Sequence, residues 1–264
     1  MSNLSELSAM MEMNEMTNEV TQDNDWETAE NINPEEGLDI GKEALALEPE
    51  TRMDLPNCED AFVLGNPYDV AGSMDFNQGD NPYNAMGNCG LVSISNMLSA
   101  GGFDVTEDDV TGFAIKNGLC NYNPYNNPAD NGGTTAEMRQ EILRRLGIDS
   151  DICPSGTTGS LENIADAIDN NKGVVISVNA GMLWDVDDGS PLVNGQPVSN
   201  HCVTVTGYAR DGNTGQITGV FIADSGRGDP GDACRYLTVE EFDDVYTNVY
   251  NSRANITCQP LKGA

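Results

Sequence analysis

The sequence predicts one globular domain of the α+β class, because helix and strand signals follow one another in mixed order after about residue 57. Several stretches combine helix-capping residues with apolar residues at helical spacing. Two strand-like runs, His201–Tyr208 and Ile217–Asp224, flank a turn rich in Gly and Asn, which is typical of an antiparallel hairpin. With 264 residues, 38% of them hydrophobic, the chain can bury one good-sized core.

Five helices are expected in this domain, most of them beginning at a capping residue. They run from Cys89 to the Gly101–Gly102 pair, from Thr106 to about Lys116, from Thr134 to Leu146, from Ser160 to Asp169, and from Thr238 to about Tyr246. Gly147 is the expected stop of the third helix, and the Thr134–Glu137 capping box is its expected start.

Long polar segments separate some of these elements. Residues 121–133 are thirteen turn formers in a row, and so long a loop in a compact domain is usually the wall or lid of a functional site. A second loop, 185–199, is rich in Gly, Asp and Pro and follows Val174–Val178, a short apolar run expected to be a buried strand. Ile256–Cys258 is expected to add an edge strand.

The hairpin gives the most specific prediction. If its turn is centred near Gly212 and Asn213, His201 lies opposite Asp224, and the pairs 203–222 and 205–220 form an apolar row on the same face. A slip by one residue would turn the apolar row of one strand to the other face, so the hydrophobic pattern supports this pairing. The register therefore predicts that Asp224 orients His201, the only histidine of the chain.

Cys89 stands at the start of the first expected helix, where the positive end of the helix dipole favours the nucleophilic thiolate. Together with His201 and Asp224 it provides the groups of a Cys-His-Asp triad. The thiolate attacks an acyl carbon, the imidazole pairs with the thiolate and protonates the leaving group, and the third residue fixes the imidazole tautomer. The alternative interpretation is a buried structural histidine, in which case the Cys89 helix start, the single histidine and the Asp224 placed opposite it would occur together by chance.

Charge and composition exclude several classes of function. Forty-three acidic against twelve basic residues give a net charge of −31, which repels nucleic-acid backbones and anionic membrane surfaces. No apolar run is long enough to span a membrane, and the acidic N-terminus lacks the features of a signal peptide. Localisation therefore stays open between the cytoplasm and export by a dedicated route that does not use such a peptide.

Residues 1–56 are expected to be a separate acidic segment, because they are rich in Met and Glu but lack the apolar periodicity of a core. The simpler interpretation is a largely disordered solvating tail. The alternatives are a pro-segment that covers the active site, or a segment that docks on secretion machinery or a carrier.

Other residues carry weaker signals. The seven cysteines contain no CxxC pair, and they are compatible with a free Cys89 plus up to three disulfides, or with free buried thiols. Cys202 should point to the sheet face opposite His201 and be buried there, and Trp184 should pack in the core in preference to lining a cleft. Residues 185–189 and 224–229 have calcium-like oxygen spacing without matching the EF-hand, so neither a metal nor a cofactor is expected.

These motifs resemble the papain-like cysteine peptidases, in particular their bacterial C39-like branch, over about residues 75–245. The similarity lies in Asn88-Cys89-Gly90 opening a helix, His201 followed by alternating Val and Thr, and the Phe221–Ser225 run that contains Asp224. The resemblance implies a helical half packed on an antiparallel sheet, with the active site in the cleft between them. Similar domains occur in secreted bacterial effectors and toxins, some of which are deamidases or transferases.

One feature departs from the family pattern. The family usually carries a Gln six residues before the nucleophile to stabilise the oxyanion, and Tyr83 stands there instead. Gln78, Asn81 and Asn84 each carry the required amide, with Gln78 favoured by residue type although it lies eleven residues upstream. Asn88 is expected to be the helix N-cap.

The sequence therefore predicts thiol-dependent acyl transfer on a peptide or amide bond, with hydrolysis of a peptide or protein substrate as the default outcome. The same triad could deamidate glutamine or join amines to it, as a transglutaminase does. A catalytically inactive papain-fold binding module is the non-enzymatic alternative, which the missing Gln favours and the intact Cys, His and Asp oppose.

Overall fold

The computed structural model describes residues 32–33, 37–38, 51–187, 189 and 192–261. Most of the predicted leader, residues 1–56, lies outside this part of the chain. Within it, β1 (Ile32–Asn33) pairs with β2 (Gly37–Leu38), and β3 (Thr51–Leu55) pairs with β4 (Cys58–Gly65). Residues 51–55 thus belong to the main sheet although they fall on the leader side of the predicted boundary.

An eight-stranded, antiparallel sheet organises the molecule, with β11, β10, β9, β6, β12 and β5 as successive neighbours. The long strand β9 pairs through its first half with β6 and through its second half with β4, which in turn carries β3. The further strands are β5 (Ser150–Pro154), β6 (Val174–Val178), β9 (His201–Asp211), β10 (Ile217–Ala223), β11 (Arg235–Thr238) and β12 (Arg253–Thr257). A separate hairpin joins β7 (Leu192–Val193) and β8 (Gln196–Pro197).

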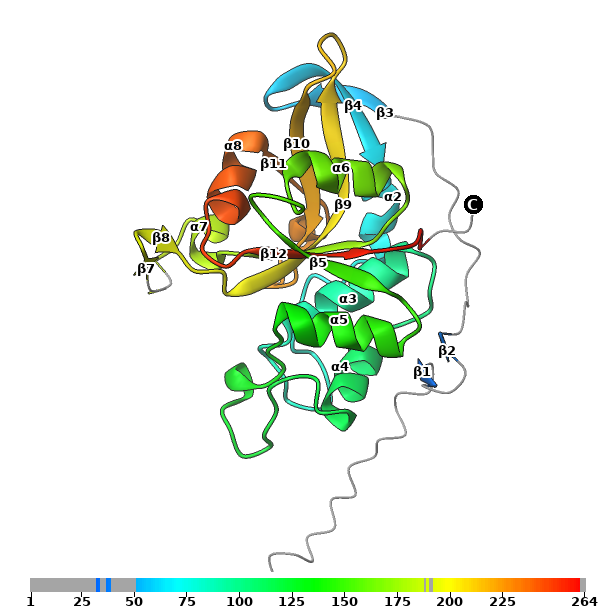
Figure 1. Cartoon of the computed structure of the whole chain (residues 1–264), viewed down its shortest axis with the longest axis vertical. Helices are drawn as coiled ribbons and strands as arrows, with labels where there is room; N and C mark the ends of the chain where they lie inside the picture. The colour runs from blue at the N-terminus through cyan, green and yellow to red at the C-terminus, as the bar shows by residue number, and fades with distance from the viewer. Residues whose placement is uncertain (1–31, 34–36, 39–50, 188, 190–191, 262–264) are drawn as a thin grey trace, which may run out of the picture.

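Helices cover both faces of this sheet, which confirms the predicted α+β class (Figure 1). One face carries α3 (Cys89–Ala100), α4 (Glu107–Lys116) and α5 (Ala136–Arg145), which form the helical half. The other face carries α6 (Leu161–Asp169) and α8 (Val239–Phe242). Shorter helices are α2 (Pro67–Val70) and α7 (Ala180–Trp184). No helix among the described residues combines the length and apolar character needed to cross a bilayer.

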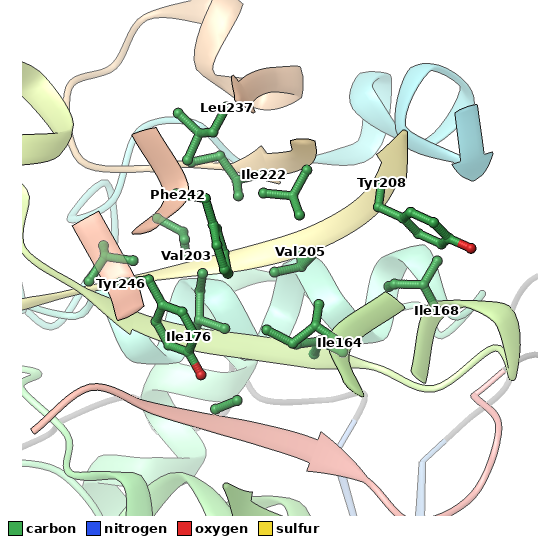
Figure 2. Close-up of a cluster of buried hydrophobic side chains, with 14 of the residues drawn as sticks. Ile164, Ile168, Ile176, Val203, Val205, Tyr208, Ile222, Leu237, Phe242 and Tyr246 are labelled. Carbon is green, nitrogen blue, oxygen red and sulfur yellow. The ribbon is translucent and has the colours of Figure 1, made fainter. Parts of the chain in front are cut away.

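The two faces of the sheet bury separate hydrophobic clusters. On the α6 side, Val203 and Val205 of β9 pack with Ile176, Ile164 and Phe242 (Figure 2). On the helical side, Leu91, Ile94 and Leu98 of α3 pack with α4, α5 and two residues of the sheet, Val175 and Cys202. Because side chains alternate along β9, His201 and Cys202 face opposite sides of the sheet, as predicted.

Local capping signals located most helices accurately. Thr106 and Asp109 form a capping box at α4, and Thr238 and Glu241 form another at α8. The box predicted at Thr134 is wrong by one residue, because Thr135 is the N-cap of α5 and its hydroxyl accepts from the Met138 N–H. After α8 the chain continues as a short π-helix, Asp243–Thr247.

The predicted hairpin register is wrong by two to three residues. The observed partners include Val205 with Ile222 and Tyr208 with Val220, in place of 203 with 222 and 205 with 220. Two bulges, at Thr206 and Thr218, and a turn closed by Asp211 and Gln216 cause the shift. Near His201 the shift is two residues, and since side chains alternate with period two, the apolar row stays on its predicted face.

The strand predicted at Ile256–Cys258 is not an edge strand. It is β12, and it lies between β6 and β5, so β5 occupies that edge. Four further strands, β3, β4, β5 and β11, are not predicted from the sequence: β3 and β5 have only five residues each, β11 has four, and β4 carries two consecutive acids, Glu59 and Asp60.

Candidate active site

Cys89 is the first residue of α3, so its backbone N–H belongs to the group of N–H donors that no helical carbonyl accepts. Asn88 stands at the N-cap position as predicted, but its side chain makes no capping bond. Its amide nitrogen instead donates to Glu107 Oε1 (2.6 Å) and to Thr111 Oγ1 (3.1 Å). Asn88 therefore ties the start of α3 to α4.

His201 begins β9 and lies against Asp224, directly after β10. The distance between His201 Nε2 and Asp224 Oδ1 is 2.6 Å, and both side chains are buried. The predicted opposition of the two residues across the hairpin is wrong, since the β9–β10 pairing ends at Thr204 and Ala223. Asp224 reaches His201 because the chain bends there, with the Gly226 N–H donating to Asp224 Oδ1.

Trp184, from α7, completes the surroundings of this pair. Its indole N–H donates to Asp224 Oδ2 at 2.7 Å, and its ring lies 5.0 Å from the His201 ring between centroids. Trp184 also packs against the core, as predicted, but the bond to Asp224 was not foreseen. Burial acts to raise the pKa of Asp224, yet the bonds from His201, Trp184 and Gly226 outweigh it and hold the pKa below its ordinary value.

Cys89 and His201 line the same cavity, whose volume is about 340 Å³. Nε2 of the imidazole is hydrogen-bonded to Asp224, so Nδ1 is the nitrogen that can accept a proton from a reacting group. Gly133, at the end of the long 121–133 loop, lines this cavity, and the Gly87 N–H donates to Asn131 O of the same loop. The loop therefore forms part of the wall, as its length predicted.

Cys202 also reaches this cavity, although the sequence suggested only structural burial. Its thiol shares a hydrogen bond with Cys89, and Arg139 Nη1 donates to its sulfur at 3.1 Å. The bond with Cys89, then Arg139 and His201, lower the pKa of Cys202 to about 5, against the effect of burial. The same bond and burial raise the pKa of Cys89 well above its ordinary value.

Within this pair the Arg139 guanidinium, 3.1 Å from the Cys202 sulfur, thus favours a negative charge on Cys202. The expected stabilisation of a Cys89 thiolate by the end of α3 is therefore opposed by burial and by the neighbouring Cys202 thiol, both of which raise the pKa of Cys89.

The three amides proposed for the oxyanion differ in how they are engaged. Gln78 bridges two relevant segments: its Nε2 donates to Met86 O, and its Oε1 accepts from Ser225, the neighbour of Asp224. The Asn81 amide nitrogen donates to Ala85 O of its own loop and to Glu107 Oε1 at the start of α4. Asn84 is exposed, with a left-handed backbone (φ 52°). Gln78 is therefore the best placed of the three, between the loop before Cys89 and the loop after Asp224.

Glu107 is a buried residue near the site that sequence reasoning assigned only to a helix cap. Its Oε1 accepts from Gly79 N, Asn81 Nδ2 and Asn88 Nδ2, so it gathers the segment that leads to Cys89. Burial raises the pKa of Glu107 to about 6, against the lowering effect of these bonds. Nothing in the local sequence distinguishes it from the neighbouring acids 108 and 109.

The loops with calcium-like spacing use their carboxylates in other ways. Asp224 binds His201, Asp229 Oδ1 accepts from the Gly231 N–H, and Asp187 Oδ1 accepts from the Gly189 N–H. The described residues contain no group of three or more His, Cys, Asp or Glu side chains placed to hold a metal ion. All seven cysteines are free, so none of the disulfides considered from the sequence is formed.

A sequence family and two solved structures are similar to this chain. The sequence model of the Peptidase_C39 like family matches residues 74–254. A solved C39-like peptidase from Bacillus anthracis is 15% identical, with 75% of this chain and 98% of that chain aligned and a TM-score of 0.48. A double glycine motif protease from an AMS/PCAT transporter, solved in complex with the leader peptide, is also 15% identical, with 65% and 84% aligned and a TM-score of 0.38. No curated protein matches the chain.

Proposed function

The chain belongs to the Peptidase_C39 like family, and from this premise we propose that it is a cysteine peptidase that uses Cys89, His201 and Asp224. Cys89 is the nucleophile, His201 is the general base and then the general acid, and Asp224 orients the imidazole. The observation that carries the proposal is the shared cavity: Cys89 and His201 line it together, while Asp224 holds the far nitrogen of the imidazole.

The first step transfers the Cys89 proton to Nδ1 of His201 as the sulfur attacks the carbonyl carbon of the scissile bond. The neighbouring Cys202 thiol and burial raise the pKa of Cys89, so a base that accepts its proton assists the attack. The buried Asp224 carboxylate, 2.6 Å from Nε2, stabilises the imidazolium that forms. His201 then protonates the leaving amine, and water hydrolyses the thioester.

The oxyanion of the tetrahedral intermediate needs donors beside Cys89. The Cys89 backbone N–H, at the start of α3, is one, and we assign the second to the amide of Gln78. This assignment requires the amide to turn from Met86 O towards the substrate oxygen. Replacing Gln78 by Ala should lower kcat by on the order of 100-fold or more, whereas Asn84→Ala should leave kcat unchanged.

Digestion of peptide libraries, read by mass spectrometry, tests the proposal. Cys89→Ala and His201→Ala should each lower kcat/KM by at least about 10⁴-fold, because nucleophile and base act as a unit. Cys258→Ala, which removes an exposed thiol, is the matched control. Turnover that survives Cys89→Ala would refute the assigned nucleophile.

The products distinguish peptidase activity from the related reactions. Cleavage gives a new amine terminus, deamidation releases ammonia without chain cleavage, and transfer to an amine adds its mass to glutamine. A folded protein with none of these activities would match the inactive binding module. A role as a secreted effector or toxin would require a target protein that is modified by one of these three reactions.

For the acidic segment before β3, most of which lies outside the described residues, a solvating tail stays the first interpretation and a pro-segment that covers the active site the alternative. A chain that starts at residue 50 keeps β3 intact, because β3 begins at Thr51. Higher kcat/KM in that chain than in the full chain would support the inhibitory role. Equal kcat/KM would contradict it and favour a solvating tail or a segment that docks on a carrier.

A further inference from the structure

Arg139 is a buried cation that forms no ion pair with a carboxylate among the described residues, although Glu137 lies within range of its charge. It projects from α5 onto the sheet and is only 1% exposed. Its Nε donates to Asn255 Oδ1, its Nη2 to Ser177 Oγ, and its Nη1 to Cys202 Sγ at 3.1 Å. Nη1 also lies 3.5 Å or less from the backbone and hydroxyl oxygens of Thr134. In the part of the chain that the structure describes, no acidic side chain forms an ion pair with this guanidinium.

A guanidinium does not lose its proton in proteins, and burying it without a counter-charge is unfavourable. Among its partners only Cys202 can become an anion, because the others are an amide, two hydroxyls and a backbone carbonyl. The Ser177 hydroxyl, 3.9 Å from the Cys202 sulfur, adds a second polar contact. The geometry therefore makes Cys202 the counter-charge of Arg139.

This thiolate is placed next to the candidate nucleophile. Cys202 and Cys89 share a hydrogen bond, one from β9 and the other from α3, which crosses that face of the sheet (Figure 1). Both line the 340 Å³ cavity, in which Cys89 is the more exposed of the two. A thiolate beside an accessible thiol is the arrangement in which one cysteine can resolve the oxidised form of the other.

We propose that Cys89 and Cys202 are a reversible oxidation site, in which the Arg139-bound thiolate of Cys202 captures peroxide-oxidised Cys89 as an internal disulfide. In the first step His201, which lines the same cavity, accepts the Cys89 proton as the Cys89 sulfur attacks the peroxide; the O–O bond breaks, Cys89 becomes a sulfenic acid, and an alcohol or water leaves with that proton. In the second step the Cys202 sulfur attacks the Cys89 sulfur, the S–O bond breaks, and hydroxide leaves.

Overall two thiols lose two electrons to one peroxide, and a thiol reductant restores them through the reverse exchange. The disulfide keeps Cys89 from the sulfinic and sulfonic acids, which are not restored in this way. If Cys89 is the nucleophile, as proposed above, the disulfide also switches the peptidase off. The chemistry of the two sulfurs stands independently of that activity.

The test treats the full chain with hydrogen peroxide, blocks free thiols with an alkylating agent, and maps the cysteines by mass spectrometry after digestion. The expected product is a Cys89–Cys202 cross-link that dithiothreitol removes. Cys120→Ala is the matched control, because Cys120 is a buried thiol of the same helical half and burial raises its pKa to about 11.

Two variants remove the resolving sulfur in different ways. Cys202→Ala leaves Arg139 without its anion and is expected to lower stability, so Cys202→Asp is the informative variant: it keeps a negative charge and contains no sulfur. In Cys202→Asp the cross-link is lost and Cys89 accumulates as sulfinic and sulfonic acid. Wild-type protein that forms these acids as fast as Cys202→Asp, with no cross-link, would overturn the proposal, whatever the peptidase assay shows.

Discussion

Replacing Glu107 by Gln tests how the segment before Cys89 is held. Glu107 Oε1 accepts three bonds, from Gly79 N (2.8 Å), Asn81 Nδ2 (2.8 Å) and Asn88 Nδ2 (2.6 Å). No basic side chain among the described residues forms an ion pair with it, and Asp75 lies near enough to help raise its pKa. A glutamine places an uncharged amide oxygen, an acceptor with two lone pairs, at the position of the carboxylate oxygen.

The pH effect follows from the raised pKa. Burial moves the pKa of Glu107 from 4.5 to about 6, so between these values the folded state binds more protons than the unfolded state. The free energy of unfolding therefore falls as pH rises through this window. The shift of the Glu107 pKa corresponds to at most about 2 kcal/mol in the free energy of unfolding, and this amount is fully lost above pH 6. Glu107→Gln should match the wild type near pH 4 and be more stable by up to about 2 kcal/mol at pH 7.

Urea denaturation of both proteins from pH 4 to pH 7.5 measures this difference directly. The many other carboxylates titrate in both proteins and cancel in the comparison. Glu59→Gln, which removes an exposed acid from β4, controls for the change in net charge. A difference between Glu107→Gln and wild type that stays flat across pH, or slopes the other way, would refute the reasoning.

The bonds around Asp224 give three further predictions. Asp224→Ala leaves the buried donors of His201 and Trp184 unpaired and should cost about 2–6 kcal/mol in urea denaturation, whereas Asp224→Asn should fold better and lower kcat by up to about 10⁴-fold. Trp184→Phe removes one donor to Asp224, whose depressed pKa should rise. The depressed pKa of Asp224 stabilises the fold at pH values above the pKa of Asp224 in the unfolded chain, and this contribution is lost as the pH falls. Trp184→Phe should therefore begin to unfold in acid at a higher pH than wild type, and an unchanged acid midpoint would contradict this. Gly226→Ala would place a Cβ 2.3 Å from the Trp184 ring and 3.1 Å from His201 Cε1, so kcat/KM should fall with a stability loss of about 1–3 kcal/mol, and full activity would contradict the tight packing.

Helix positions were predictable because their signals are local. The capping boxes at Thr106 and Thr238 involve residues only three positions apart, and the structure contains both. The one-residue error at Thr134 arose because Thr134 and Thr135 are equally good caps by type, and only the fold assigns Thr135 to that role. Local chemistry thus locates a helix end to within a residue.

The hairpin shows which features local sequence signals do not predict. Alternation placed His201, Val203 and Val205 on the correct face, but it contained no sign of the bulges at Thr206 and Thr218. The right acid, Asp224, was selected through a wrong register. An error of two residues preserves the face of every side chain, and the bend after β10 then brings Asp224 to His201.

Arg139 was not predictable in the same way. It occurs in a helix that also carries Arg144 and Arg145, which form exposed pairs with Glu141, and nothing in the sequence separates it from them. Its burial depends on Ser177, Cys202 and Asn255, which come from three different strands. Only the packing of α5 on the assembled sheet brings these residues together.

Two buried charges of opposite sign, Glu107 and Arg139, are connected to Cys89 from different directions. Glu107 holds Asn88, which precedes Cys89, and Arg139 holds Cys202, which shares a hydrogen bond with the Cys89 thiol. Neither forms an ion pair with an oppositely charged side chain among the described residues, although the Glu137 carboxylate lies near enough to Arg139 for their charges to interact. Glu107 responds by a pKa raised to about 6, and Arg139 is compensated by ionising a thiol. Cys89 thus lies between Glu107, whose carboxyl group holds the preceding residue, and Cys202, which raises the pKa of the Cys89 thiol. Changing either charge should therefore alter the reactivity of Cys89 without replacing a residue of the triad.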